Sequence, residues 1–296
     1  MVAKVISGPE VAEQIRTELR EKIAFLKGKG ITPGLAVVLV GEDPASQQYV
    51  RNKGKACEEL GLYSRTIVLP AETSEEKLLA VVDELNADPK VHGFLVQSPV
   101  PGHIDENKIT LRIDPAKDAD GFHPMNVGRM LIGNPLFLPA TPAGIQEMLV
   151  RSGNDPDGKH VVIVGRSNIV GKPVAAILMQ KRKGANATVT VCHSRTKDLA
   201  SITRTGDIVI AAIGSPRFIT ADMIKEGAVV IDVGTNRVDD PTAKKGFRWV
   251  GDVDFEAVKE KASAITPVPG GVGPMTIVML MKNTVMAAYR ANGLEY

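Results

Sequence analysis

Short apolar runs alternate with segments of helical periodicity along most of the chain. In the first half, the run GLAVVLV (34–40) precedes a helical segment that has Asp43 as its N-cap, starts at Pro44 and ends at Gly61. Further helices are predicted over 11–26 and 73–88, and further strands over 64–70 and 92–101. This alternation predicts an open parallel sheet, which binds ligands beyond the carboxyl ends of its strands.

The second half repeats the alternation and contains the most informative turn. Strands are predicted at 160–165, 187–194, 207–214 and 228–235, the spacing of a Rossmann-type sheet. The first of these ends at Gly165, and a helical pattern starts from Pro173. Gly165 permits a tight turn, Gly171 permits a close approach, and the helix N-terminus favours a phosphate. Because Ser167 replaces the second glycine of GxGxxG, the pattern favours a dinucleotide site only slightly over an ordinary βα turn.

A segment rich in Gly, Pro, Asn and Asp (117–144) separates the two halves and predicts a long irregular connection. The tail contains a Pro/Gly loop and then an amphipathic helix, which we expect to pack back on the first domain. We therefore predict an α/β protein of two domains with a cleft between them. Residues 1–139 plus 275–296 form an α/β domain with a parallel sheet, and residues 140–274 form a Rossmann-type dinucleotide-binding domain.

Composition excludes several classes of protein. The 296 residues are 44% hydrophobic, which indicates a folded protein, and 36 basic against 34 acidic residues leave a dispersed net charge of +2. We expect no nucleic-acid or membrane partner, no signal peptide and no membrane span. Cys57 and Cys192 form no CxxC pattern and are expected to be small buried side chains in a cytoplasmic protein. The five histidines show no paired ligand spacing, so no metal is predicted.

Four polar residues stand out by their place in the predicted fold. Tyr49 and Lys53 lie four positions apart on one helix face, Gln97 ends the third strand, and Asp120 opens the irregular connection. Taken singly, they are typical of a surface pair, a solvated strand end and a turn residue. The strand-end rule nevertheless places the loop before Tyr49 and Gln97 on one edge, which Asp120 must cross, and this convergence favours a site.

Eight segments in order resemble the bifunctional methylenetetrahydrofolate dehydrogenase/methenyltetrahydrofolate cyclohydrolase family over essentially the whole chain. They are YVRNKGKA (49–56), VQSPVP (96–101), KDADGFHP (117–124), TPAGI (141–145), VIVGRSNIVGKP (162–173), TVCHSRT (190–196), DVGTNRV (232–238) and TPVPGGVGPMT (266–276). Each is weak alone, but their order is specific. The chain departs from the family pattern at Ser98, Ala119, Ala140 and Thr235, beside the polar residues rather than at them.

The resemblance implies NADP-dependent oxidation of 5,10-methylenetetrahydrofolate to the 5,10-methenyl form, and hydrolysis of that product to 10-formyltetrahydrofolate. It implies that Lys53 is the central catalytic group, with Tyr49, Gln97 and Asp120 in the same folate cleft. Hydride loss needs no protein base, whereas hydrolysis needs a group that activates water. A lysine beside the methenyl cation is partly neutral, and the Gln97 amide oxygen can orient its amine. Asp120 can accept paired hydrogen bonds from a pterin, and Tyr49 offers a ring face.

The end of the second Rossmann strand favours NADP over NAD. NAD sites usually place an acidic residue there, but this strand ends in Cys192, His193, Ser194 and Arg195. Arg166 and Ser194, together with Arg195, can bind the 2′-phosphate, although Arg195 alone is also typical of a solvated loop. The rest of the cofactor groove is predicted to consist of Gly165, Ser167, Ile169, Gly171, Gly214 and Thr235.

The Pro/Gly loop of the tail is predicted to face the folate substrate through Pro269, Gly270 and Gly271. The resemblance also implies a homodimer formed through the NADP domain. Two alternatives stay open: a dehydrogenase that has lost the hydrolysis step, and a non-catalytic NADP-binding sensor on the same fold.

Overall fold

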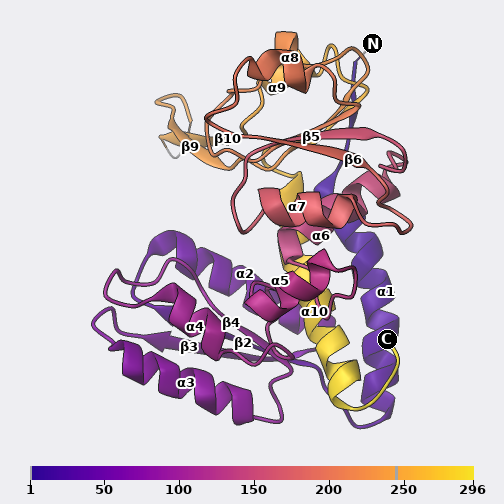
Figure 1. The fold of residues 1–296 in the computed structure, drawn as a ribbon. Helices are drawn as coiled ribbons and strands as arrows, with labels where there is room; N and C mark the ends of the chain where they lie inside the picture. Colours follow the sequence, from indigo (N-terminus) through magenta and orange to yellow (C-terminus); the bar gives the residue numbers. More distant parts are fainter. Residues whose placement is uncertain (1, 244–245) are drawn as a thin grey trace. The chain divides into compact units, whose positions relative to one another are not determined.

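The computed structural model describes residues 2–243 and 246–296, which form two compact units (Figure 1). The three-stranded unit consists of Gln14–Ala140 and Ile277–Tyr296, and the six-stranded unit consists of the segment up to Glu13 and Thr141–Thr276. Each unit contains a parallel sheet with helices, as the alternating pattern predicts, and the six-stranded unit adds an antiparallel pair of short strands.

The helices and strands of the three-stranded unit are α1 (Gly8–Gly28), which begins in the other unit, β2 (Gly34–Val40), α2 (Pro44–Leu60), β3 (Tyr63–Leu69), α3 (Glu75–Ala87), β4 (Gly93–Val96), α4 (Glu106–Arg112) and α5 (Pro124–Leu131). Those of the six-stranded unit are β1 (Lys4–Val5), α6 (Ala140–Arg151), β5 (His160–Val164), α7 (Gly171–Leu178), β6 (Thr188–Cys192), α8 (Leu199–Thr203), β7 (Ile208–Ala211), η1 (Ala221–Met223), β8 (Val229–Asp232), β9 (Asn236–Asp239), β10 (Phe247–Val250), α9 (Phe255–Val258) and β11 (Ala264–Ile265). Helix α10 (Val272–Ala291) begins in the six-stranded unit and continues in the other.

In the three-stranded unit, β2 lies between β3 and β4 and is parallel to both. All seven residues of β2 are buried, since helices cover both faces of this strand. Ala36, Val38 and Val40 pack with α3 and α4 on one face, and right-handed crossovers place α2 on the other. The carboxyl ends of β2 and β4 therefore meet at one edge, where the loop before α2 and Gln97 follow them.

In the six-stranded unit, the order is β1-β11-β8-β7-β5-β6 and all neighbours are parallel. Helix α7 packs against β5 and β6, and the opposite core contains residues from α8, η1 and α9. Figure 1 shows α7 on one side of this sheet and α8 and α9 on the other. After β6 the chain returns to the other side of β5, so the topological switch point lies between β5 and β7.

The predictions that rest on the local stereochemistry of a few residues are confirmed. The predicted strand 34–40 coincides with β2, Asp43 accepts a hydrogen bond from the Ser46 amide at 2.7 Å, and Gly61 ends α2 with φ 69°. Cys57 and Cys192 are free and buried. None of the helices in the described ranges combines the length and hydrophobicity that crossing a membrane requires.

Three features differ from the sequence-based expectations. The first residues join the six-stranded sheet through β1, which pairs with β11, whereas the boundaries predicted from the sequence include them in the first domain. The irregular connection contains α5, whose N-cap is His123, with Nδ1 accepting a hydrogen bond from the Met125 amide at 3.0 Å. Helix α10 is not amphipathic, because successive residues over 278–281 and 283–285 are buried.

Candidate active site and cofactor groove

Lys53 is a buried charged residue of the three-stranded unit. Although it lies on a helix, it is only 7% exposed, and its Nζ donates a hydrogen bond to Gln97 Oε1 at 2.9 Å. The Gln97 backbone amide continues the β4 ladder by donating to Val38 at 2.8 Å, and its Nε2 donates to the Ser98 carbonyl at 2.8 Å. Both ends of the Gln97 amide are therefore engaged, which directs its oxygen toward the amine.

Asp120 is carried by a loop that runs beside β4. The Phe94 amide donates to the Lys117 carbonyl at 2.9 Å, and Phe94 forms an isolated parallel bridge with Asp118. Lys117 Nζ in turn donates to the Leu85 carbonyl at 3.1 Å and the Asp88 carbonyl at 2.8 Å, at the end of α3. The start of the loop is thus tied to both strand and helix, which brings Asp120 within electrostatic reach of Lys53.

Burial shifts the titration of both charged groups. It lowers the pKa of the Lys53 amine below its ordinary value, and attraction to Asp120 offsets part of this effect. Burial raises the pKa of the Asp120 carboxyl, and Lys53 opposes that shift. The Lys53 amine therefore loses its proton at lower pH than the amine of a solvated lysine does, and only the neutral amine can accept a proton.

Tyr49 lies one helical turn before Lys53 and is 49% exposed. The two residues therefore differ from a solvated surface pair, since the amine is buried while the aromatic ring is accessible to a ligand. Pro269, Gly270 and Gly271 lie between β11 and α10 in the six-stranded unit. Their predicted contact with the substrate stays a prediction.

The turn between β5 and α7 leaves no room for side chains at its two glycines. A Cβ on Gly165, whose φ is +128°, would lie 2.1 Å from the Ala212 carbonyl oxygen, and one on Gly171 would lie 2.2 Å from the Gly165 oxygen. Ser167 Oγ accepts hydrogen bonds from the Val170 amide at 3.2 Å and the Gly171 amide at 3.4 Å. Ser167 thus stabilises the start of α7 from the position where GxGxxG has a glycine.

Two exposed turns lie together at the ends of β5 and β6. The Gly165 amide donates to the Cys192 carbonyl at 2.9 Å, which joins the turn after β5 to the turn after β6. The side chains predicted to contact the cofactor here are all exposed: Arg166, Ser167, Ile169, Ser194 and Arg195. Gly214 and Thr235, in the loops after β7 and β8, are exposed as well. A glycine-bounded turn with arginines and no carboxylate from Cys192 to Lys197 fits a phosphorylated dinucleotide.

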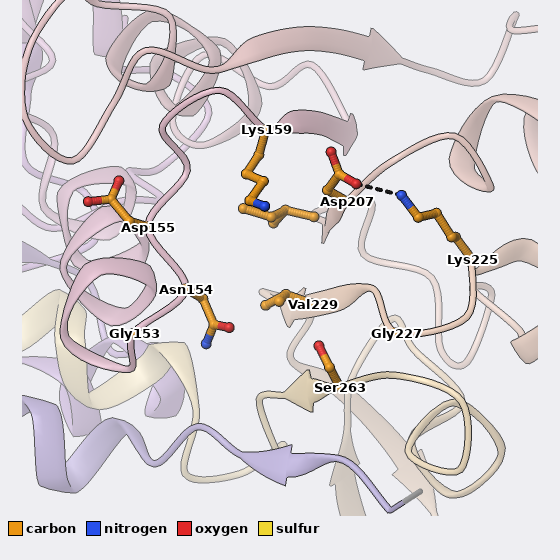
Figure 2. Close-up of a pocket in the computed structure, with 10 residues that line it drawn as sticks. Gly153, Asn154, Asp155, Lys159, Asp207, Lys225, Gly227, Val229 and Ser263 are labelled. Carbon is orange, nitrogen blue, oxygen red and sulfur yellow. Dashed lines mark hydrogen bonds and ion pairs between the residues drawn. The ribbon is translucent and has the colours of Figure 1, made fainter.

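A cavity of about 360 Å³ lies elsewhere in the six-stranded unit, at the amino ends of β7 and β8. Figure 2 shows Lys225 directed toward Asp207, with which it forms an ion pair, and Lys159 and Asp155 on the same rim. The charges of two lysines and two aspartates cancel around this cavity. None of the predicted site residues, all of which the structure describes, lines this cavity.

Two family models match the chain, one for each functional region. Residues 139–292 match the family model described as the tetrahydrofolate dehydrogenase/cyclohydrolase NAD(P)-binding domain, and residues 6–120 match the model of the catalytic domain. The chain belongs to the tetrahydrofolate dehydrogenase/cyclohydrolase family. This membership confirms the family predicted from the eight segments.

Individual members of the family are similar over their full length. The chain is 60% identical over 296 residues to the bifunctional protein FolD of Dehalococcoides mccartyi strain CBDB1, covering 99% of each. It is also similar to the crystal structure of FolD from Campylobacter jejuni, with 48% identity, a TM-score of 0.90, and 97% and 99% of the two chains covered. The Trypanosoma brucei methylenetetrahydrofolate dehydrogenase-cyclohydrolase, complexed with NADP cofactor and inhibitor, gives 44% identity and a TM-score of 0.92 over 99% of both chains.

These findings confirm the two-domain α/β fold, the enzyme class and the NAD(P)-binding domain. The roles of individual residues and the cleft between the domains stay predictions. Within residues 2–243 and 246–296, no group of three or more His, Cys, Asp or Glu side chains is arranged to hold a metal ion. That the enzyme needs no metal also stays a prediction.

Sequence reasoning missed the residues that shape the Asp120 loop. Asp118 is buried and accepts hydrogen bonds from the amides of Gly121 and His123 and from the Asn126 side chain. From α10, Asn283 Nδ2 donates to the Ala119 carbonyl at 2.8 Å. The available signal was the paired acidic residues of DADG, but nothing in the sequence shows which carboxylate binds backbone amides.

Proposed function

We propose that this family member oxidises 5,10-methylenetetrahydrofolate with NADP and then hydrolyses the 5,10-methenyl product to 10-formyltetrahydrofolate. The observation that carries the proposal is the buried Lys53 amine, held by Gln97 and paired electrostatically with Asp120. A buried, oriented amine of lowered pKa has a clear use in hydrolysis, in which a base must accept a proton from water.

The oxidation step requires no acid or base from the protein. Hydride leaves the methylene carbon, and the lone pairs of the two flanking folate nitrogens stabilise the resulting cation. NADP, when bound, supplies the hydride acceptor. The protein residues therefore bind and orient the reactants, with Asp120 accepting hydrogen bonds from the pterin edge and Tyr49 stacking on a ring.

The hydrolysis step uses the amine directly. The neutral Lys53 amine accepts a proton from water as the water oxygen bonds to the methenyl carbon. The Lys53 ammonium then gives this proton to folate N5, and the bond from N5 to the carbon breaks. The hydroxyl oxygen forms the C=O bond and its proton leaves to solvent, so that the carbon remains on N10 as a formyl group. Gln97 keeps the amine oriented by accepting one of its hydrogens at 2.9 Å.

The preference for NADP over NAD rests on the turns after β5 and β6. Arg166 and Ser194 are exposed on adjoining turns, and the segment from Cys192 to Lys197 contains no carboxylate. These side chains would hold the 2′-phosphate by charge-assisted hydrogen bonds. The glycine-bounded turn would admit the pyrophosphate close to the α7 N-terminus.

Replacing Lys53 by glutamine tests the proposal. The Lys53→Gln variant should hydrolyse methenyl-folate about 10²- to 10⁴-fold more slowly, the range of general base catalysis, while methylene-folate oxidation falls far less. The absorbance of methenyl-folate without cofactor measures the first reaction, and NADPH formation measures the second. Lys55→Gln, an exposed lysine on the same helix, is the matched control and should keep both rates. Hydrolysis by Lys53→Gln at the parent rate would contradict the assigned role.

The two alternatives give different results with the unmodified protein. A dehydrogenase that has lost hydrolysis would form NADPH but leave methenyl-folate as stable as it is in buffer. An NADP-binding sensor would bind NADP but would not bind folate in a direct titration. The buried Lys53–Gln97 pair argues against both alternatives.

A homodimer formed through the NADP-binding unit and a cytoplasmic location complete the proposal. The dimer is supported by the family resemblance, and the location by two buried free thiols. Sedimentation velocity should show a species of about twice the 31.6 kDa chain mass, and a species of single mass would contradict the dimer.

A further inference from the structure

Asp252 is a buried carboxylate that gathers the backbone of the loop after β7. It is fully buried, and it accepts hydrogen bonds from three successive amides, those of Ile213 at 2.7 Å, Gly214 at 3.0 Å and Ser215 at 2.9 Å. A fourth hydrogen bond comes from Asn236 Nδ2 at 2.9 Å, at the start of β9. One side chain thus fixes the loop that follows β7 and reaches the segment that follows β8.

Asp232 fixes Asp252 in turn. Asp232 ends β8, is buried, and accepts hydrogen bonds from the amides of Asp252 at 2.9 Å and Val253 at 3.0 Å. Its third bond, at 2.9 Å, comes from the Gly234 amide, and a Cβ on Gly234 would lie 2.3 Å from Asp252 Oδ1. The two carboxylates and the β8 loop are therefore packed without free space.

Burying two neighbouring carboxylates costs free energy, so their presence here calls for a physical reason. Burial raises the pKa of the Asp232 carboxyl to about 6, and the three amides act against this rise. The loop that Asp252 holds also contains Arg217 at φ 53°, a left-handed conformation that a residue other than glycine adopts only with external support. Part of that support is the Arg217 amide, which donates to the Gly251 carbonyl at 3.0 Å.

The loop in question borders the switch point of the sheet. Gly214 follows β7, and Gly165, on the other side of the switch point, packs against the Ala212 carbonyl. Ligands of open α/β sheets bind where the strand order reverses, so the conformation of this loop determines the shape of the cofactor groove.

We propose that Asp252 is a positioning residue for NADP, which sets the groove by holding 213–215 and Asn236 without touching the cofactor. This inference rests on the proposed function, because it takes the carboxyl edge of the six-stranded sheet as the NADP site. Substitution should therefore weaken cofactor binding specifically, whereas a purely structural carboxylate would affect both reactions alike.

Asp252→Asn tests the inference, since asparagine keeps the shape but replaces one acceptor oxygen by a donor that faces an amide. The expected results are a Kd for NADP raised at least ten-fold, by fluorescence titration, and a KM for NADP raised similarly. The KM for folate and the cofactor-free hydrolysis of methenyl-folate should change less than two-fold.

Asp207→Asn is the matched control. Asp207 also accepts a backbone amide, that of His160 at 2.9 Å, and pairs with Lys225, but it lies at the amino edge of the same sheet. Its variant should lower the unfolding midpoint without changing the Kd for NADP. A change in Kd of less than two-fold in a folded Asp252→Asn would overturn the inference, as would an equal change in Asp207→Asn.

Asn236→Ala settles the question if Asp252→Asn does not fold, because it removes only one of the four hydrogen bonds. It should raise the Kd for NADP about two- to five-fold, and an unchanged Kd would reject the positioning role. The unmodified enzyme separates the two hypotheses: failure of the parent protein to bind NADP contradicts the proposed function, whereas normal binding by both parent and variants contradicts only this inference.

Discussion

The Lys53 amine is subject to two opposed influences, burial and the charge of Asp120. Burial favours loss of the proton, and the Asp120 carboxylate favours its retention. If the neutral amine is the base, hydrolysis must rise with pH as the proton leaves. The midpoint of that rise should lie below 10.5, the ordinary value of a lysine pKa.

Asp120→Asn separates the two influences. Removing the carboxylate removes the attraction that raises the Lys53 pKa, so the midpoint should move to lower pH even though folate binds less tightly. The measurement is the cofactor-free hydrolysis rate at saturating methenyl-folate from neutral to alkaline pH, after subtraction of the buffer reaction.

Glu59→Gln is the matched control, since Glu59 is an exposed carboxylate on the same helix as Lys53. Its midpoint should equal that of the parent. An Asp120→Asn midpoint that stays in place, or moves to higher pH, would show that Asp120 does not control the amine.

At this scale, sequence reasoning succeeded where topology fixes a residue. The strand-end rule predicted that Gln97 and the loop before α2 share an edge, and the hydrogen bond from Lys53 to Gln97 has the predicted partners. Asp118, Asp232 and Asp252 were missed, because each binds backbone amides of distant segments. Such partners depend on loop conformation, which residue type and spacing do not determine.

At the scale of elements, the turn from β5 to α7 depends on two glycines in contact. Gly171→Ala would place a methyl group 2.2 Å from the Gly165 carbonyl oxygen, so the turn and the helix must separate. We expect a loss of about 1–3 kcal/mol in the free energy of unfolding, as for other overpacked sites. NADP binding should weaken by at least ten-fold, because the same turn borders the cofactor.

Gly128→Ala is the control for that prediction. Gly128 lies within α5, and a Cβ there meets no atom within 4 Å, so alanine should leave stability unchanged or raise it by up to about 1 kcal/mol. Urea unfolding and NADP titration measure both variants. Parent-like stability and affinity in Gly171→Ala would show that the close approach is not required.

Elements were predictable to the extent that their own residues define them. Strand β2 and the caps of α2 follow from an apolar run, an aspartate, a proline and a glycine. Strand β1 has two residues and is defined only by its pairing with β11, which comes from the other end of the chain and pairs with β8 on its second side. Helix α5 was missed because a histidine ring nitrogen, an unusual acceptor, caps it.

At the scale of the molecule, both compact units are assembled from separate stretches of chain. The tail returns to the three-stranded unit, where Asn283 bonds the Ala119 carbonyl and the Tyr289 hydroxyl donates to the Lys22 carbonyl at 3.1 Å. The hydrophobic residues of the tail helix predicted this return, because such a helix needs an apolar surface to pack against. The contribution of the first residues to the other unit had no such signal, because β1 is exposed and short.

Because the six-stranded unit contains the proposed cofactor groove, its stability should report cofactor binding quantitatively. A ligand that binds only the folded state adds about 2.7 kcal/mol to the free energy of unfolding at 100 times its Kd. If Arg166 binds the 2′-phosphate, Arg166→Ala should lose much of the stabilisation by NADP but keep that by NAD, which lacks this phosphate. Thermal unfolding midpoints measured with each cofactor at matched concentrations give the comparison.

Lys181→Ala removes an equal charge at another exposed position of the unit and should lose neither effect. Equal losses with NADP and NAD in Arg166→Ala would place Arg166 at a part of the cofactor common to both and would leave the preference for NADP without its proposed cause.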